Sequence, residues 1–114
     1  MKTRTAEEVF AHHGEALVAE DLEGIIGDYA DDAIIIANKQ VHRGKEGARA
    51  VFTQALDVLQ HATWQLDPVF ADEVLYLEWK ASADGVGIDN GVDTFVFRDG
   101  LIRFLTLSFT LVPA

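Results

Sequence analysis

Apolar positions near the start of the chain repeat three and four residues apart, as they do on one face of a helix. This first stripe consists of Val9, Phe10, His13, Ala16 and Leu17. Ahead of it, Thr5 is followed three positions later by Glu8, the pattern of a capping box, in which each side chain bonds the other residue's backbone N–H. We therefore expect a first helix over about residues 5–20.

A second, shorter helix is predicted directly after the first. Asp21 is a favoured N-cap residue, because its carboxylate accepts a hydrogen bond from a free backbone N–H of the first turn. The apolar stripe behind it is Leu22, Ile25, Ile26 and Tyr29. The acidic pair Asp31 and Asp32 is expected to end this helix.

The next apolar run, Ala33–Ala37, is short and rich in β-branched residues, so it predicts a buried strand. The segment HRGKEG at residues 42–47 is interpreted as a turn. Helical spacing then returns and predicts a third helix that ends near Gln60. Its stripe is Ala48, Val51, Phe52, Ala55, Leu56 and Leu59.

Beyond Gln60 the pattern changes to the alternation of strands. Four candidate strands occupy residues 64–70, 73–83, 92–98 and 101–112, and the glycine-rich GVGIDNG is interpreted as a loop between two of them. The two-residue connection Asp99-Gly100 favours a tight hairpin, since both residue types tolerate positive φ. Pro68 is acceptable in an edge strand. The second half of the chain is therefore predicted to be an antiparallel meander.

The last candidate strand is apolar or weakly polar in both of its alternating sets, whereas a strand with one face in water shows one clearly polar set. Both faces of the sheet are therefore expected to be covered. The helices can cover one face, and we expect a second copy of the chain to cover the other, giving a homodimer through the outer sheet face. The alternative is that loops of the same chain cover it.

Composition and charge narrow the partners. The 114 residues suit one domain, residues 1–114, and a net charge of −10 disfavours nucleic acid and anionic membranes as partners. Without cysteine there is no disulfide, thiolate metal site or cysteine nucleophile. The acidic start of the chain does not resemble a signal peptide and no apolar run is long enough to span a bilayer, so a cytoplasmic protein is expected.

Asp93 alternates in phase with Phe95 and Phe97, which predicts a carboxyl group on the apolar side of its strand. Apolar surroundings disfavour the anion and raise the pKa, so such an acid can keep its proton near neutrality and donate a hydrogen bond. The alternative is a solvated residue at the start of a strand.

Two segments carry a resemblance to a known family. The first is EDLEGIIGDYADDAIII at residues 20–36, and the second is VDTFVFRDGLI at residues 92–102. With the order of the helices and strands, they resemble the nuclear transport factor 2-like superfamily, and within it the SnoaL-like and ketosteroid-isomerase-like proteins. The resemblance implies an α+β fold: a cone-shaped α+β barrel with three N-terminal helices packed into a strongly curved antiparallel sheet, and an apolar pocket at its open end. It leaves function open, because the fold hosts isomerases, dehydratases, cyclases and carriers.

The resemblance also implies site positions. Asp93 matches the acid that, with a tyrosine, hydrogen-bonds the developing enolate oxygen in ketosteroid isomerases. The tyrosine's place is taken by His13, and the pocket-side tyrosine of the third helix by Phe52. The general-base position falls at Ala37, which cannot take a proton. A steroid-type proton shuttle therefore lacks its central base, and His13 with Asp93 is the remaining catalytic pair.

A pocket of this kind is expected to have mostly aromatic and aliphatic walls. The candidate ligand-binding residues are Phe10, Tyr29, Ile36, Asn38, Phe52, Leu56, Trp64, Trp79, Phe95 and Phe97. For most of them plain core packing is the alternative, for Asn38 a turn role, and for His13 a backbone hydrogen bond at the edge of the core. His12 and His13 point about 100° apart on a helix, and no other histidine has ligand spacing, so no metal is expected. The sequence has no P-loop and no dinucleotide-binding G-x-G-x-x-G, and no cofactor is expected either.

Three classes of function remain. The first is a cofactor-independent acid-base enzyme, of the isomerase, cyclase or dehydratase class, acting on a largely apolar carbonyl compound. The second is a binding protein that holds a small apolar ligand without catalysis. The third is a dimerisation module whose interior is filled by its own side chains. Ala37 disfavours the first class, and an inward Asp93 disfavours the third, since an unpaired buried carboxylate is costly.

Overall fold

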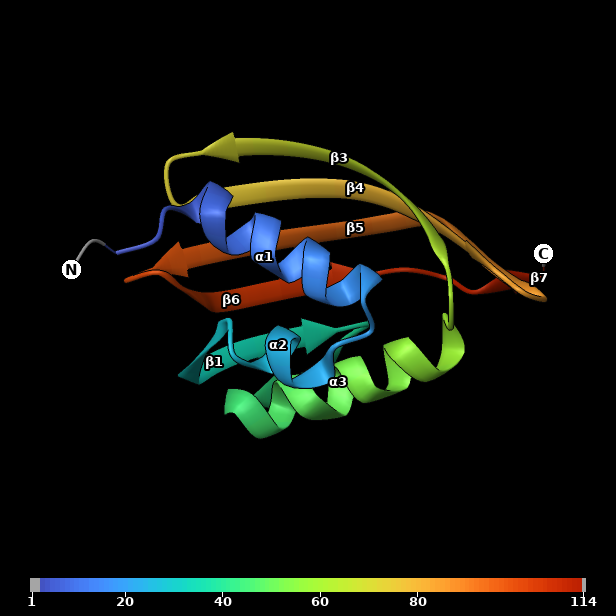
Figure 1. The fold of residues 1–114 in the computed structure, drawn as a ribbon, viewed down its shortest axis with the longest axis horizontal. Coiled ribbons are helices and arrows are strands. Elements are labelled where there is room, and N and C mark those ends of the chain that lie inside the picture. Colours follow the sequence, from blue (N-terminus) through green and yellow to red (C-terminus); the bar gives the residue numbers. More distant parts are fainter. Residues whose placement is uncertain (1–2, 114) are drawn as a thin grey trace.

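One strongly curved sheet carries the fold, with the helices on its concave side (Figure 1). The computed structural model describes residues 3–113. In chain order the elements are α1 (Ala6–Val18), α2 (Leu22–Ile26), β1 (Tyr29–Ala37), β2 (Gln40–Arg43), α3 (Gly44–Val58), β3 (Thr63–Ala71), β4 (Val74–Ala83), β5 (Val86–Arg98), β6 (Leu101–Ser108) and β7 (Val112–Pro113). The predicted α+β class, a cone-shaped sheet around three helices, is confirmed, although the sheet does not close into a barrel.

The strand order is β2-β1-β6-β5-β4-β3, and β7 pairs with β5. The antiparallel meander from β3 to β6 is confirmed, and β1 joins it as the one parallel neighbour, on β6. Asp99 and Gly100 both have positive φ, as the tight hairpin requires. Pro68 lies in β3, an edge strand, as expected.

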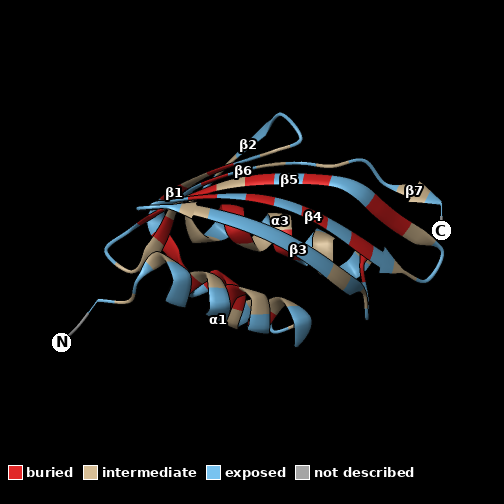
Figure 2. Cartoon of the chain, turned by 90° about the horizontal axis from the view of Figure 1, so that it is seen from above, coloured by how far each residue is buried: buried red, intermediate tan, exposed pale blue. Residues whose placement is uncertain are grey.

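The starts of α1 and α2 follow the sequence signals. Thr5 and Glu8 form the predicted capping box, and Asp21 accepts a hydrogen bond from the Gly24 N–H at 3.0 Å. Burial alternates along β4, so that every second side chain faces the helices (Figure 2). No helix in the described residues 3–113 is long and apolar enough to cross a membrane.

The second helix is shorter than predicted. It ends at Ile26, and Tyr29, Asp31 and Asp32 belong to strand β1 instead. Tyr29 fits the helical spacing of the apolar residues before it, but its side chain is buried because it belongs to strand β1. The Lys45 ammonium donates to the carbonyls of Ile26 and Tyr29, satisfying backbone acceptors where the helix gives way to the strand.

Three loop boundaries also differ from the prediction. Residues 42–47, predicted as a turn, instead belong to the end of strand β2 and the start of helix α3. Strand β2 pairs with β1 because Asn38 and Lys39 both take positive φ and close a two-residue hairpin. GVGIDNG lies mostly within β5 instead of a loop. The last predicted strand is two strands, since residues 109–111 leave the ladder between β6 and β7.

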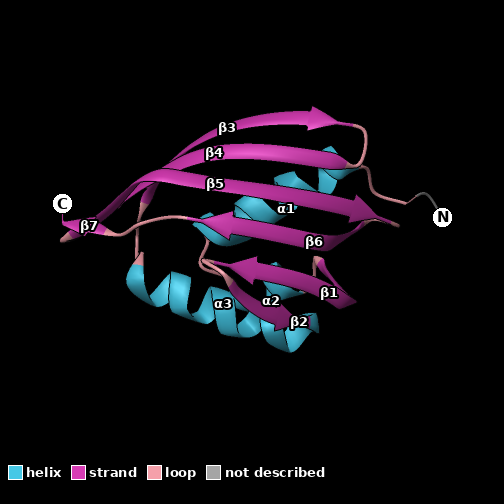
Figure 3. Cartoon of the chain, turned by 180° about the vertical axis from the view of Figure 1, so that it is seen from behind, coloured by secondary structure: helices cyan, strands magenta, loops and turns pink. Residues whose placement is uncertain are grey.

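The convex face of the sheet is not covered by other elements of this chain. Figure 3 shows this face, with all three helices behind the strands. Several of its apolar side chains are more than a third exposed: Ile36, Val41, Val69, Val74, Tyr76, Val92 and Phe104. The alternative given for the sequence, that loops of the same chain cover this face, is therefore wrong for the described residues 3–113.

Candidate functional site

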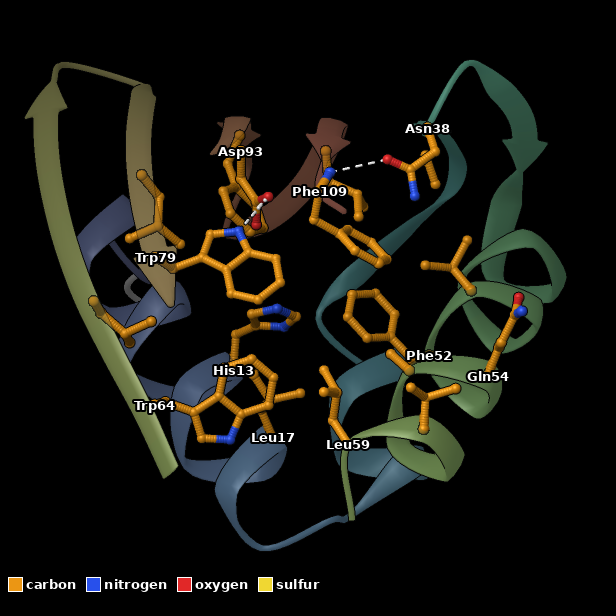
Figure 4. Close-up of a pocket in the computed structure, with 18 of the residues that line it drawn as sticks. His13, Leu17, Asn38, Phe52, Gln54, Leu59, Trp64, Trp79, Asp93 and Phe109 are labelled. Carbon is orange, nitrogen blue, oxygen red and sulfur yellow. Dashed lines mark hydrogen bonds between the residues drawn. The ribbon is translucent and has the colours of Figure 1, made fainter. Parts of the chain in front are cut away.

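A pocket of about 550 Å³ lies between the concave face of the sheet and helices α1 and α3. Figure 4 shows its walls, with His13 and Leu17 from α1 on one side and Phe52 and Gln54 from α3 on the other. The interior is therefore open and not filled by the chain's own side chains.

Asp93 projects into this pocket from β5. It is opposite Leu77 on β4 and Leu107 on β6, both of which also line the pocket, so the alternation with Phe95 does place it inward. Its Oδ1 accepts a hydrogen bond from the Trp79 indole N–H at 2.8 Å (Figure 4). No other hydrogen bond reaches its carboxylate within residues 3–113, which leaves Oδ2 available to a ligand.

Burial raises the pKa of Asp93 to about 7, and the hydrogen bond from Trp79 opposes that shift. Only 9% of the residue's surface is exposed. An acid with this pKa is present both protonated and ionised near neutral pH. Its free oxygen can therefore donate a hydrogen bond in one state and accept one in the other.

Gly91 makes the Trp79 contact possible. Trp79 pairs with Gly91 across the β4–β5 ladder, and a Cβ atom at position 91 would overlap the indole ring. Without that atom, the indole lies across β5 and reaches Asp93 two residues further along the same face.

His13 is buried at the back of the pocket, 4% exposed. Its ring meets the edges or faces of three aromatic rings, Tyr29, Phe52 and Phe95, with ring centroids 5.4 to 5.8 Å apart. Desolvation lowers the pKa of His13 to about 4, partly opposed by the negative charge of Asp28. The imidazole is therefore neutral at physiological pH, with one N–H donor and one acceptor nitrogen.

His13 and Asp93 line the same pocket without a hydrogen bond between them in the described chain. Asp93 is bonded to Trp79 instead, and Nδ1 of His13 has no partner. The Asp93 carboxylate therefore does not orient the His13 imidazole through a hydrogen bond. The two groups are separate polar points in an apolar wall.

A second buried carboxylate, Asp28, lies near His13 but outside the pocket lining. It accepts hydrogen bonds from the Arg4 guanidinium at 3.0 Å and is 2.8 Å from Nδ1 of His12. Arg4 also donates to the Gly100 carbonyl. Arg4 therefore links the N-terminal segment to the β5–β6 hairpin. Its guanidinium also compensates the negative charge of the buried Asp28 carboxylate.

Two asparagines hold the segment that closes one side of the pocket. The Phe109 N–H donates to Oδ1 of Asn38 at 2.9 Å, and the Thr110 N–H donates to Oδ1 of Asn90 at 2.9 Å. Phe109 packs on Trp79 with ring centroids 5.8 Å apart. Residues 109–111 thus form a strap that carries an aromatic ring to the pocket.

The structure brings together most of the candidate residues. Those that line the pocket are Phe10, His13, Asn38, Phe52, Trp64, Trp79, Asp93 and Phe95. Tyr29, Ile36, Leu56 and Phe97 are not among the lining residues. Tyr29 and Phe97 are buried beneath the pocket, while Ile36 lies on the exposed convex face because its strand position has the opposite parity to Ile35.

Sequence reasoning missed the strap and the polar rim. Gln40, His42 and Gln54 line the pocket, as do Phe109 and Leu111. The predicted turn at residues 42–47 includes His42, whereas strand β2 directs both Gln40 and His42 toward the pocket. The signal for the strap was Asn38, an amide next to a predicted strand end, although its partner is 71 residues away in sequence.

No group of three or more potential metal ligands occurs within residues 3–113, and no lysine or arginine lines the pocket. The polar side chains of the lining are therefore the carboxyl group of Asp93, the imidazoles of His13 and His42, the hydroxyl of Thr110 and the amides of Asn38, Gln40 and Gln54. Such a set can orient a polar group of a ligand and exchange one proton with it at Asp93.

The chain thus has the cone-shaped α+β fold, with a largely apolar pocket between its sheet and its helices. The chain belongs to the SnoaL-like domain family, which matches residues 9–105. The resemblance found in the sequence is thus confirmed.

Solved structures agree on the fold. An NTF-2 like protein of unknown function from Burkholderia xenovorans superposes with a TM-score of 0.78 at 19% identity, covering 92% of this chain and 82% of that one. A candidate ketosteroid isomerase from Kribbella flavida gives 0.77 at 12% identity, with 95% and 81% coverage. A candidate polyketide cyclase from Sinorhizobium meliloti gives 0.68 at 17% identity, with 88% and 93% coverage. A search of curated proteins finds no match.

Proposed function

We propose that this protein binds a largely apolar, carbonyl-bearing small molecule, with the carbonyl oxygen at Asp93. The observation that carries the proposal is the free Oδ2 of a buried carboxyl group in an otherwise apolar wall. In its protonated state Asp93 donates a hydrogen bond from Oδ2, while the Trp79 indole satisfies Oδ1.

The volume and lining support this ligand class. Its volume of about 550 Å³ is within the range of pockets that hold drug-sized ligands. Such pockets are usually lined by aromatic and aliphatic side chains with a few polar groups, as this one is. Neutral His13 adds a second polar point at the back of the pocket. A ligand that places one oxygen at Asp93 and an aromatic or polycyclic body between Phe52 and Trp64 would suit this lining.

Catalysis is the second candidate, and the pKa of Asp93 near 7 is the observation that favours it. An acid-base group works best when its pKa is close to the working pH. Against it stands the general-base position at Ala37, so Asp93 would have to act with His13 alone. Binding is therefore the primary function we assign.

Calorimetry with two probes of the same shape tests the binding proposal. Naphthylacetone presents a carbonyl, and isobutylnaphthalene replaces that carbonyl by a hydrocarbon branch. We expect the ketone to bind at least about threefold more tightly, the contribution of one neutral hydrogen bond. Asp93→Leu should abolish this preference, while Asp93→Asn, which keeps an N–H donor, should retain it. Equal affinity of the two probes for the wild-type protein would contradict the proposal.

Proton exchange separates a binding protein from an enzyme. If Asp93 and His13 abstract a proton, the methylene protons of bound naphthylacetone will exchange with deuterated solvent faster than in buffer, and Asp93→Leu will remove the acceleration. Unaccelerated exchange together with calorimetric binding assigns the protein as a carrier.

We also propose that the chain forms a homodimer through the convex face of the sheet. The support is the row of exposed apolar side chains on that face, which includes Val74, Tyr76, Val92 and Phe104. Analytical ultracentrifugation should give twice the 12.5 kDa chain mass. Val92→Lys should produce monomers, and Val18→Lys, which charges an exposed valine on α1, should not. A wild-type monomer at high micromolar concentration would refute the dimer.

A further inference from the structure

The charged side chains that line the pocket are acidic and not basic. Among the described residues 3–113, Asp93 is the only acidic residue in the lining, and no lysine or arginine accompanies it. The two histidines of the lining are His13, whose lowered pKa keeps it neutral, and His42. A net charge of −10 over the whole chain adds a field that attracts cations. These features disfavour anionic ligands and do not disfavour cationic ones.

Aromatic rings cluster around the Trp79 indole that hydrogen-bonds Asp93. The Trp79 indole donates to the Asp93 carboxylate, and the Phe109 and Trp64 rings lie 5.8 and 5.6 Å from that indole, centroid to centroid. Phe95 lies two residues along the same strand face and also lines the pocket. The negative faces of such rings attract organic cations, tryptophan most strongly. A carboxylate beside several rings is thus a suitable environment for an ammonium group.

We propose that the pocket also binds organic ammonium ions carried on an apolar body, with the ammonium between Oδ2 of Asp93 and the rings of Trp79 and Phe109. Oδ2 is the atom without a hydrogen bond from the described protein, so it can accept one from the ammonium. The inference rests on the proposed function only in using the same pocket. Here Asp93 accepts as a carboxylate, whereas a ketone requires it as a protonated donor.

Ligand choice then depends on pH. An ammonium ion stabilises the carboxylate, so its binding releases a proton from Asp93 wherever the free acid still holds one. The other titratable groups around Asp93 are His13 from α1, Tyr29 from β1 and His42 from β2. His13 and Tyr29 stay uncharged near neutrality, because burial lowers the pKa of the first and raises that of the second.

The test compares naphthylethylamine with its neutral counterpart naphthylethanol by calorimetry. At about pH 8, where Asp93 is mostly ionised, we expect the ammonium to bind at least about tenfold more tightly than the alcohol. At about pH 6 the preference should shrink several-fold, and titrations in two buffers of different ionisation enthalpy should show proton release. In a ¹⁵N-labelled sample, the indole N–H resonance of Trp79 should shift on binding, since this N–H donates to Asp93.

Two variants assign the preference to named groups. Asp93→Asn should remove the preference for the ammonium at both pH values while keeping affinity for naphthylacetone, because the amide still donates. Phe109→Leu retains Asp93 but removes one aromatic ring. It should lower the affinity for naphthylethylamine more than the affinity for naphthylethanol. Unchanged amine selectivity in both variants would overturn the inference.

The outcomes also separate this inference from the proposed function. If naphthylacetone binds and naphthylethylamine binds no better than the alcohol at about pH 8, the ammonium inference fails and the carbonyl proposal stands. If the amine binds with the expected selectivity and naphthylacetone shows no preference over its hydrocarbon, the carbonyl proposal fails instead. If none of the probes binds, both fail.

Discussion

At the scale of single residues, an absent side chain controls the buried acid. Gly91 leaves the space that the Trp79 indole occupies, and that indole donates the one hydrogen bond that the Asp93 carboxylate receives from the described protein. The backbone of Gly91 is not in the left-handed region, so its role is to leave room rather than to permit an unusual conformation.

Gly91→Ala is therefore expected to displace Trp79 and destabilise the protein by about 1–3 kcal/mol, the usual cost of overpacking. The pKa of Asp93 should rise further, since the hydrogen bond that lowers it is lost. Urea unfolding and carboxyl carbon NMR measure the two effects. Gly87→Ala, in the same strand as Gly91, is the matched control, because a Cβ atom at position 87 would make only ordinary van der Waals contacts. Equal effects of both substitutions would show that Gly91 has no special role.

The residue scale also marks a limit of sequence reasoning. Alternation with Phe95 was enough to predict that Asp93 faces the interior. Its partnership with Trp79 was not predictable, because it depends on the register of two strands and on a bulge in that ladder after Trp79. Likewise His13 was predicted as a pocket residue, but the absence of a bond to Asp93 follows only from three-dimensional geometry.

At the scale of elements, local signals predicted well and long-range pairings did not. Helix caps, the Asp99-Gly100 hairpin and the meander all arise from neighbouring residues, so the sequence shows them directly. The parallel β1–β6 pair and the strap at residues 109–111 depend on contacts between opposite ends of the chain. The boundary of α2 failed for a related reason, since Lys45 from α3 stabilises the turn that ends it.

The strap gives an element-scale prediction. Asn38→Gly keeps a residue that tolerates the positive φ of this turn but removes the amide that accepts from Phe109. We expect amide hydrogen exchange of Phe109 to accelerate by about tenfold, the loss of roughly one hydrogen bond, with little change in β4. Lys39→Gly, at the other positive-φ position of the same turn, controls for the added backbone freedom. Unchanged exchange at Phe109 would mean that Asn90 and packing alone hold the strap.

At the scale of the whole molecule, the two buried titratable groups of the pocket oppose one another in their effect on stability. The pKa of His13 falls from 6.5 to about 4 on folding, so between these values the unfolded chain binds the extra proton and stability rises with pH. The pKa of Asp93 rises from 3.8 to about 7, so over that range the folded chain binds the extra proton and stability falls with pH. Across the shared window the two slopes nearly cancel.

Removing either group should expose the slope of the other. Relative to wild type, Asp93→Asn should gain stability as pH rises from about 4 to 6.5, by up to about 1.4 kcal/mol per pH unit, and His13→Leu should lose stability over the same window. Urea unfolding at a series of pH values measures both, and subtracting the wild-type curve removes contributions from the other ionisable groups. The double variant should return close to the wild-type pH dependence. Slopes of the same sign in the two single variants would show that the pocket does not hold both groups uncharged. If the difference between Asp93→Asn and wild type did not change with pH, the wild-type Asp93 carboxyl would be exposed to water.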